Sequence, residues 1–261
     1  MSVTWTSAYA AASPYPMTHA RILYTPASGA ATASSEVEGF EAALALNPDT
    51  YSYWMPSATP ATWAVDFGSP KAVDAVGIAA HSLAGQAVAV DTWDGTAWVE
   101  QVPAFAVADN SPILMLFAEV TTTKVQVRVD GVPQPVGVIY AGRALAMPQK
   151  AYVGLGQINL KRRTEFKINQ TEGGNWAGRS IARVSLIAAY QWTHITDAFY
   201  LANVEPFSFS ARQYPFFLAA RPSGYPEETT HAWVAADIAP ERMGVLDFCS
   251  VGFEAIGYSR A

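Results

Sequence analysis

Short apolar runs separated by turn residues dominate the first half of the chain. Three such runs cover Trp63–Phe67, Val73–Ala80 and Gln86–Trp93, and they are rich in Val, Ile and Trp. Runs of this length and composition, bounded by turn residues, are typical of strands. Asp94-Gly95 follows the third run, between Trp93 and Trp98, and predicts a hairpin because Gly supplies positive φ without steric cost. The pattern therefore predicts an antiparallel β unit at the centre of the N-terminal half.

Further strands extend this pattern toward residue 148. Lys124–Asp130 (KVQVRVD) alternates strictly, which predicts a strand with one buried valine face and one solvated face. Gly39–Leu46 favours one short helical turn before Asn47-Pro48-Asp49, which stops it. Seven or eight short strands with almost no helix predict an all-β sandwich or jelly roll. The other strands expected here are Arg21–Thr25, Ile113–Val120 and Val136–Ala141.

The second half predicts another, smaller β domain. Leu160–Gln170 and Arg179–Tyr190 have the character of strands on either side of the turn Thr171–Gly178, so we expect a hairpin. His194–Leu201 is expected to form a short helix beside it, and Phe207-Ser-Phe-Ser210 alternates as a strand does. The other strands expected here are Tyr214–Ala220, His231–Ala236, Val245–Cys249 and Val251–Tyr258.

Charge is divided unevenly about Pro148. Residues 1–148 hold 5 Lys/Arg and 12 Asp/Glu, a balance of −7, and residues 149–261 hold 11 and 10, a balance of +1, which together give the net charge of −6. We therefore predict an N-terminal arm or first strands at 1–19, a jelly roll at 20–148 and a second β domain, used in assembly, at 149–261. The basic run Lys161-Arg162-Arg163 is expected to be a solvated face at the start of a strand or a bridge to an acidic neighbour. No nucleic-acid partner is predicted, since phosphate contacts require clustered cations.

Composition favours a folded chain made in a reducing cytoplasm. Apolar residues make up 51% of the chain and charged ones 15%, which argues against disorder. The single cysteine, Cys249, excludes an internal disulfide and a cysteine-based zinc site, and we expect it to pack in the core. The first residues lack the features of a signal peptide, and no apolar run approaches the roughly 20 residues of a membrane span.

Part of the N-terminal half is similar to a known family. Thr32-Ala-Ser-Ser35, Tyr53-Trp54, Trp63-Ala-Val-Asp-Phe-Gly-Ser-Pro70 and Val73–Ile78 resemble the discoidin, or coagulation-factor type C, galactose-binding-like domain. Phe67 takes the place of the usual Leu in the third motif. The resemblance covers roughly residues 20 to 147 and implies an eight-stranded jelly roll whose end loops bind sugar, lipid or protein. The chain lacks the paired terminal cysteines of many secreted members of that family, as a cytoplasmic version would.

The C-terminal end carries a second, looser resemblance. The stretch from Pro215 to Glu227, followed by an aromatic strand and Val251–Tyr258, resembles the C-terminal part of tail-tip structural proteins of long-tailed bacteriophages. The resemblance implies a virion component made in the bacterial cytoplasm. Its partners would be copies of itself in a ring and other tail proteins such as the tail tube, hub and tape measure.

No catalytic, cofactor or metal motif is present in the sequence. The four histidines have neither His-x-x-x-His nor Glu-x-x-His spacing, and Gly154-Leu-Gly156 is an isolated glycine pair. A glycosidase would need two carboxylates across a cleft. Asp66 lies inside an apolar strand and is expected to accept hydrogen bonds from loop backbone. We therefore expect no enzymatic activity, no cofactor and no metal, and rank a hydrolase last. Asp49, Asp66, Asp91 and Asp94 could supply the glycosidase pair by number alone.

A few aromatic residues and one histidine are the candidates for ligand or interface contacts. His81 follows the strand Val73–Ala80, where a jelly roll presents loop residues. An exposed Trp near a turn can stack on a sugar or anchor a protein interface, although capping of the core is an equally good interpretation for each. The candidates are Trp54, His81, Trp93, Trp98 and Trp176.

Two functions are consistent with these sequence features. The first is a non-enzymatic distal or minor tail protein that assembles through strand edges and aromatic patches into a ring. The alternative is a carbohydrate-binding module or host-recognition adhesin. The two are compatible, because a tail component can also contact host surface glycan.

Overall fold

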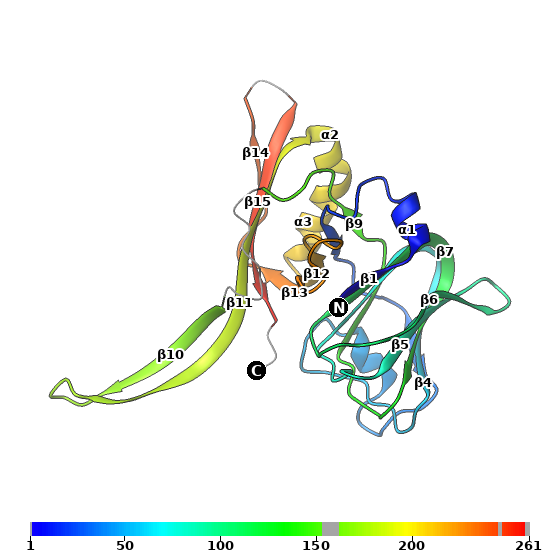
Figure 1. The fold of residues 1–261 in the computed structure, drawn as a ribbon, viewed down its shortest axis with the longest axis horizontal. Coiled ribbons are helices and arrows are strands. Elements are labelled where there is room, and N and C mark those ends of the chain that lie inside the picture. Colours follow the sequence, from blue (N-terminus) through cyan, green and yellow to red (C-terminus); the bar gives the residue numbers. More distant parts are fainter. Residues whose placement is uncertain (1, 153–161, 245–246, 259–261) are drawn as a thin grey trace.

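The computed structural model describes residues 2–152, 162–244 and 247–258, and it confirms the predicted all-β architecture (Figure 1). Two sheets hold the described strands. The first contains β1 (Val3–Trp5), β3 (Ala30–Ala33), β4 (Ala61–Ala79), β5 (Ala87–Trp93), β6 (Trp98–Ala106), β7 (Ile113–Asp130) and β8 (Val138–Gly142). The second contains β2 (Arg21–Leu23), β9 (Leu145–Ala146), β10 (Arg162–Gln170), β11 (Trp176–Thr196), β12 (Phe216–Ala219), β13 (Thr229–Val234), β14 (Pro240–Arg242) and β15 (Phe248–Gly257).

Two long strands, β4 and β7, fold the first sheet over on itself. They pair antiparallel along their length, but the register shifts between Asp66 and Lys71, where Gly68 has a φ of +72°. Such a break bends a strand and increases its twist. One end of β4 then pairs with β3 and the other with β8. The runs 63–67 and 73–80, expected as separate strands, are therefore the two ends of one strand that crosses between the layers of a sandwich.

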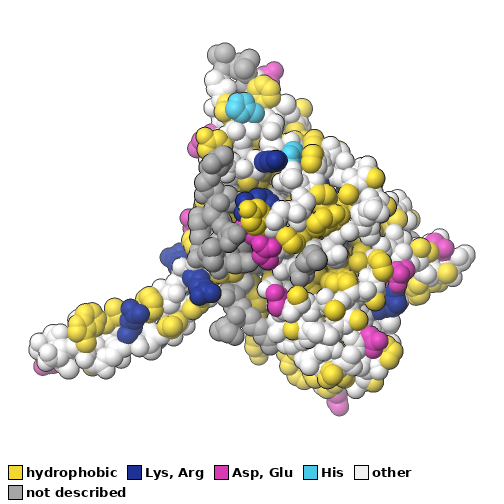
Figure 2. Space-filling view, viewed as in Figure 1, with side chains coloured by type: hydrophobic (Ala, Val, Ile, Leu, Met, Phe, Trp, Pro, Cys, Tyr) yellow, Lys and Arg dark blue, Asp and Glu magenta, His cyan; other side chains and the backbone are white. Residues whose placement is uncertain are grey.

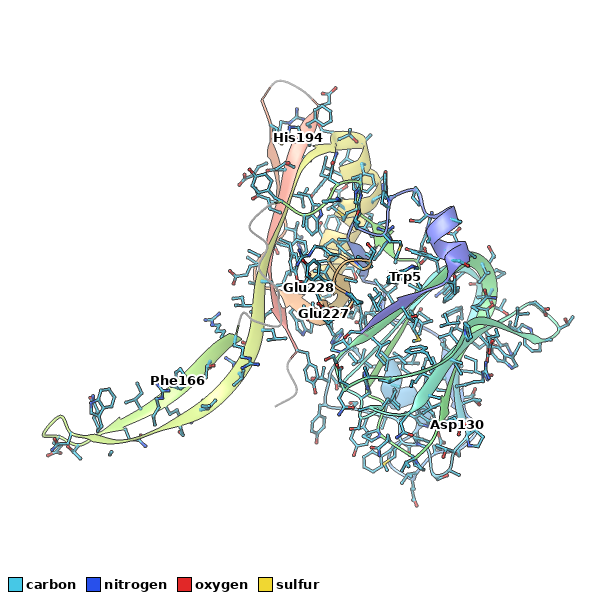
Figure 3. All side chains as sticks on the ribbon, viewed as in Figure 1. Trp5, Asp130, Phe166, His194, Glu227 and Glu228 are labelled. Atoms are coloured by element: carbon cyan, nitrogen blue, oxygen red, sulfur yellow. The ribbon has the colours of Figure 1, made fainter. Side chains whose placement is uncertain are left out.

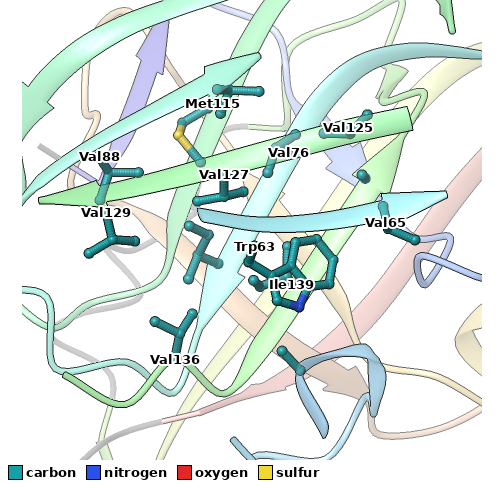
Figure 4. Close-up of a cluster of buried hydrophobic side chains, with 14 of the residues drawn as sticks. Trp63, Val65, Val76, Val88, Met115, Val125, Val127, Val129, Val136 and Ile139 are labelled. Carbon is teal, nitrogen blue, oxygen red and sulfur yellow. The ribbon is translucent and has the colours of Figure 1, made fainter. Parts of the chain in front are cut away.

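The space between these layers is filled by the main apolar core (Figure 4). Strand β7 contributes its valines, as the strict alternation predicts, and β4 contributes Trp63. The indole Nε1 of Trp63 donates to the backbone oxygen of Ala42 at 2.9 Å, which ties the short helix η1 (Ala42–Leu46) to the core. The N–H of a buried Trp usually forms such a hydrogen bond.

The second sheet is covered on one face by a run of helical turns: α2 (Asp197–Phe199), the π-helical η3 (Tyr200–Val204) and α3 (Glu205–Ala211). Strand β12 lies between β13 and β2 and is buried on both faces. Phe216 and Leu218 face the core under the helices, whereas Phe217 and Ala219 face the first sheet. Alternation along a strand produces this division.

The two sheets therefore share a third apolar cluster and form one packed body. Leu23 and Phe217 of the second sheet pack there against Leu114 and Tyr140 of the first. A Cβ atom added at Gly77 would lie 2.7 Å from the Phe217 ring, so the close approach of the layers requires glycine at this position. Helix α1 (Ser7–Ala12) lies beside this junction.

Three expectations are corrected by the structure. Residues 21–23 belong to the second sheet, where β2 pairs with β12 and β9, so the sandwich does not begin at residue 20. The alternating Phe207-Ser-Phe-Ser210 lies in helix α3, because Phe207 packs there against Phe216 and Phe253. The N-terminal segment holds a helix as well as strand β1. Gly154, Gly156, Lys161 and the start of the strand expected at Val245 lie outside the described residues.

Candidate functional site

The five candidate contact residues do not form a single site. Trp54 and His81 are both fully buried. The indole of Trp54 donates to the backbone oxygen of Ser35 at 3.1 Å. In His81, Nε2 lies 2.8 Å from the backbone oxygen of Ser111, and Nδ1 accepts from the backbone N–H of Leu83. Neither side chain presents a surface to a ligand, which corrects the sequence-based expectation for these two residues.

Trp93 and Trp98 face each other across the turn that joins β5 and β6. Their ring centroids are 5.3 Å apart at an interplanar angle of 69°, and Trp98 is 37% exposed. The predicted Asp-Gly turn is held by Asp94, whose Oδ1 accepts from the backbone N–H groups of Thr96 and Ala97. The pair thus forms a partly exposed aromatic step at one end of the sandwich.

Two further sequence predictions are confirmed by geometry. Asp66 accepts from the backbone N–H of Gly68 at 2.9 Å and pairs with Lys124 at 3.1 Å. Both contacts stabilise the carboxylate form, the first more strongly, so the pKa of Asp66 lies below its usual value. Cys249 is buried in the core of the second sheet, and burial raises its thiol pKa.

Trp176 lies on a two-stranded ribbon that projects from the second sheet (Figure 1). We call this ribbon the arm and define it as β10 together with residues 176–186 of β11. No described residue of the arm is buried. Beyond it, β11 continues into the body of the sheet, where it pairs with β15.

One face of the arm is apolar. Phe166 pairs with Ile181, and Ile168 lies two residues further along the same face. The guanidinium of Arg179 lies 3.9 Å from the centroid of the Phe166 ring, which places it on that face as well. Phe166, Ile168, Ile181 and Trp176 are 43%, 51%, 64% and 71% exposed. Figure 3 shows Phe166 on the arm, away from both cores.

A cavity of about 580 Å³ opens where the N-terminal segment, the first sheet and the helices meet. Tyr9, Ser13 and Tyr15 line it from the N-terminal segment, and Phe199 and Asn203 line it from the helical side. The charged groups of its wall are Asp74, Glu119 and Arg143. Asp74 is not among the residues predicted from the sequence, although a carboxylate inside the apolar run Val73–Ala80 is unusual enough to indicate a special role.

The described residues contain no group of three or more His, Cys, Asp or Glu side chains placed to hold a metal ion. Within the same part of the chain, no helix has the length and apolar character needed to cross a membrane.

Comparisons with known proteins found similarity in structure alone. No protein-family model and no curated protein matches the sequence. Chitosan-binding module 1 of a Paenibacillus sp. IK-5 chitosanase/glucanase is 22% identical, with a TM-score of 0.39, over 45% of this chain and 97% of the module. A pectin-binding carbohydrate-binding module is 16% identical, with a TM-score of 0.40, over 46% and 93%. The family 32 module of Clostridium perfringens NanJ, solved with galactose, is 12% identical, with a TM-score of 0.41, over 46% and 98%.

Proposed function

We propose that this chain is a non-enzymatic structural subunit that assembles with copies of itself through the arm. The observation that supports this proposal is the exposed apolar face formed by Phe166, Ile168, Ile181 and Trp176. An isolated two-stranded ribbon is at best marginally stable in water, and exposed apolar faces of this kind mark interaction surfaces. Complete burial of such a side chain contributes about 1.5–3 kcal/mol.

Charge favours a second copy of the chain as the partner. Residues 162–186, which are the arm and the turn that joins its two strands, hold five Arg/Lys and two Glu, a balance of +3. The first 148 residues have a balance of −7. The N-terminal half of a neighbouring copy therefore has a net charge of opposite sign, and charge complementarity steers association and selects partners. In the view of Figure 2, basic and apolar side chains alternate along the arm.

We further propose that the assembly is the tip of a bacteriophage tail, where the chain would contact the tail tube, hub or tape measure. This location rests on the resemblance of Pro215–Glu227 and Val251–Tyr258 to tail-tip proteins. The two segments lie in β12 with the loop after it and in β15, and β15 pairs with the strand that carries the arm. Mass spectrometry of purified virions tests the location, and absence of the chain from them would contradict it.

Replacing the apolar pair of the arm, Phe166→Glu with Ile181→Glu, should convert an oligomer into a 28.0 kDa monomer. Two carboxylates would then have to be desolvated in the contact, with Arg179 as a cation beside them on that face of the arm. Light scattering after gel filtration measures the mass. Both positions are exposed, so thermal unfolding of the variant should stay within a few degrees of the wild type.

The matched control places the same charges on the opposite face of the arm. Asn169 and Ser180 lie on that polar face, and Asn169→Glu with Ser180→Glu should leave the oligomer intact. A wild-type chain that is monomeric at about 100 µM, or a control that dissociates as fully as the test variant, would refute assembly through the apolar face.

Carbohydrate binding is the second candidate, and the Trp93–Trp98 step favours it. A half-exposed indole at the end of a sandwich can stack on the apolar face of a sugar ring. On a glycan array, Trp98→Ala should then lower binding at least tenfold, whereas Tyr51→Ala, at a 91% exposed tyrosine, should not change it. An array without signal, or equal loss in both variants, would argue against this function.

A further inference from the structure

Asp74 lies in the wall of the cavity where the N-terminal segment, the first sheet and the helices meet, which we call the junction cavity. Within the part of the chain that the structure describes, only one of its two carboxylate oxygens accepts a hydrogen bond. The residue is 8% exposed, and its Oδ1 accepts from the backbone N–H of Ala144 at 2.7 Å. No other hydrogen bond or ion pair of this carboxylate is found among the described residues. A buried charge is costly unless it is paired and hydrogen-bonded. The second oxygen, Oδ2, is thus available to a group that enters the cavity.

The nearby arginines are already committed to other acceptors. Arg21 is fully buried and donates to the hydroxyl of Tyr9 at 3.0 Å, to Ser13 Oγ at 2.8 Å and to backbone carbonyls of residues 15, 16, 19 and 20. Arg143 pairs with Glu119 at 2.8 Å. Neither forms an ion pair with Asp74. Burial raises the pKa of Asp74 to about 7, and the charge of Glu119 adds to this, whereas the hydrogen bond from Ala144 and the charges of Arg143 and Arg21 oppose it.

Aromatic side chains complete the wall around this carboxylate. Tyr9, Tyr15, Tyr24 and Phe199 line the cavity, and the rings of Tyr15 and Phe199 meet edge to face with centroids 6.2 Å apart. Aromatic rings attract cations through their negative faces and also pack against an aliphatic stem. The charged side chains on the wall comprise two carboxylates and one guanidinium, a balance of −1 when all are ionised.

We infer that the junction cavity binds a small organic cation, with a primary ammonium group on Oδ2 of Asp74 and an aliphatic stem against the rings of Tyr15, Tyr24 and Phe199. An ammonium supplies the donor and the positive charge that Asp74 lacks. The cavity is built from the N-terminal segment, the first sheet and the helices, so it is distinct from the arm and from the Trp93–Trp98 step. This inference does not depend on self-assembly.

The test compares n-butylammonium with n-butanol, which has the same stem without the charge. Titrations followed by amide chemical shifts of the full chain at pH 8 should show saturable binding of n-butylammonium with changes around residues 74, 144 and 199. For n-butanol, binding should be at least tenfold weaker. Equal binding of the two compounds, or no saturable binding of n-butylammonium, would overturn the inference.

Two further measurements identify Asp74 as the partner of the ammonium. Asp74→Asn should weaken n-butylammonium binding at least tenfold, while Glu241→Gln, at an exposed carboxylate on β14, should leave it unchanged.

Binding by the wild type should weaken about tenfold from pH 8 to pH 6 as Asp74 takes up a proton. The groups that face Asp74 are Tyr9 of α1, Glu119 of β7, Arg21 of β2 and Arg143. If Asp74→Asn binds n-butylammonium as tightly as the wild type does, Asp74 is not the partner of the ammonium group.

Discussion

Replacing Asp74 by Asn should stabilise the protein at pH 8 by about 4 kcal/mol. Burial raises the pKa of this carboxyl from 3.8 to about 7, a difference of about 3 units at about 1.36 kcal/mol each. The folded state holds its proton up to pH 7, whereas the unfolded state loses it above pH 4. Stability from this group is therefore fully present below pH 4 and is lost as the pH rises to 7. Asn keeps an oxygen to accept from the backbone N–H of Ala144 and cannot ionise.

Urea unfolding at pH 4 and pH 8 measures this effect. The gain from Asp74→Asn should be large at pH 8 and close to zero at pH 4, where the wild-type carboxyl is protonated in the folded state. Asp109→Asn is the matched control, because Asp109 also accepts a backbone hydrogen bond but is exposed. It should change stability by less than about 0.5 kcal/mol. A gain of equal size at both pH values would show that charge burial is not its cause.

Replacing His231 by Leu should make the protein more stable at pH 4 relative to pH 7, by about 3 kcal/mol compared with the wild type. His231 is 2% exposed, and its ring lies 4.7 Å from the Phe217 ring and 6.0 Å from the Tyr140 ring, measured between centroids. Its Nε2 has no hydrogen-bond partner among the described residues. Burial lowers its pKa from 6.5 to about 3. Between pH 6.5 and pH 3, His231 is therefore protonated in the unfolded state but not in the folded state.

Stability from His231 is present above pH 6.5 and falls as the solution is acidified toward pH 3. Between pH 7 and pH 4 the wild type should lose about 3 kcal/mol through this residue, and His231→Leu should not. Urea unfolding at the two pH values measures the difference. His194→Asn serves as the control, since His194 is exposed and Asn tolerates its φ of +59°. If the free energy of unfolding differs between pH 7 and pH 4 by the same amount in His231→Leu as in the wild type, His231 is not the group responsible.

The two buried groups act in opposite directions over an overlapping range. Between pH 4 and pH 6.5, Asp74 lowers stability as the pH rises and His231 raises it, so their contributions to the wild-type slope nearly cancel. Each variant should keep only the pH dependence of the other group. Compared with the wild type, the free energy of unfolding of Asp74→Asn should fall more steeply as the pH is lowered. That of His231→Leu should fall more steeply as the pH rises toward 7. The contribution of these two positions should be nearly flat over this range in the double variant, because neither then carries a group that titrates there.

The tertiary structure changed the interpretation of the candidate residues more than that of the strands. Trp54 and His81 were predicted at loop ends, where side chains are commonly exposed, yet both are fully buried. The sequence correctly predicts that both residues lie next to turns. Whether a turn residue points outward depends on what packs over it: Trp54 is bridged to Val136, 82 residues away in the chain. Local sequence does not contain that contact.

The sequence by itself determined the local elements: the alternating strand Lys124–Asp130, the Asp94-Gly95 turn and the hairpin of the arm. These follow from side-chain period and turn dihedrals, which act over a few residues. The tertiary structure alone decided that residues 21–23 join the second sheet, that Phe207 turns inward on a helix, and that Asp74 faces a cavity. These outcomes depend on which distant segments cover a given face, since burial is a property of neighbours and not of local pattern.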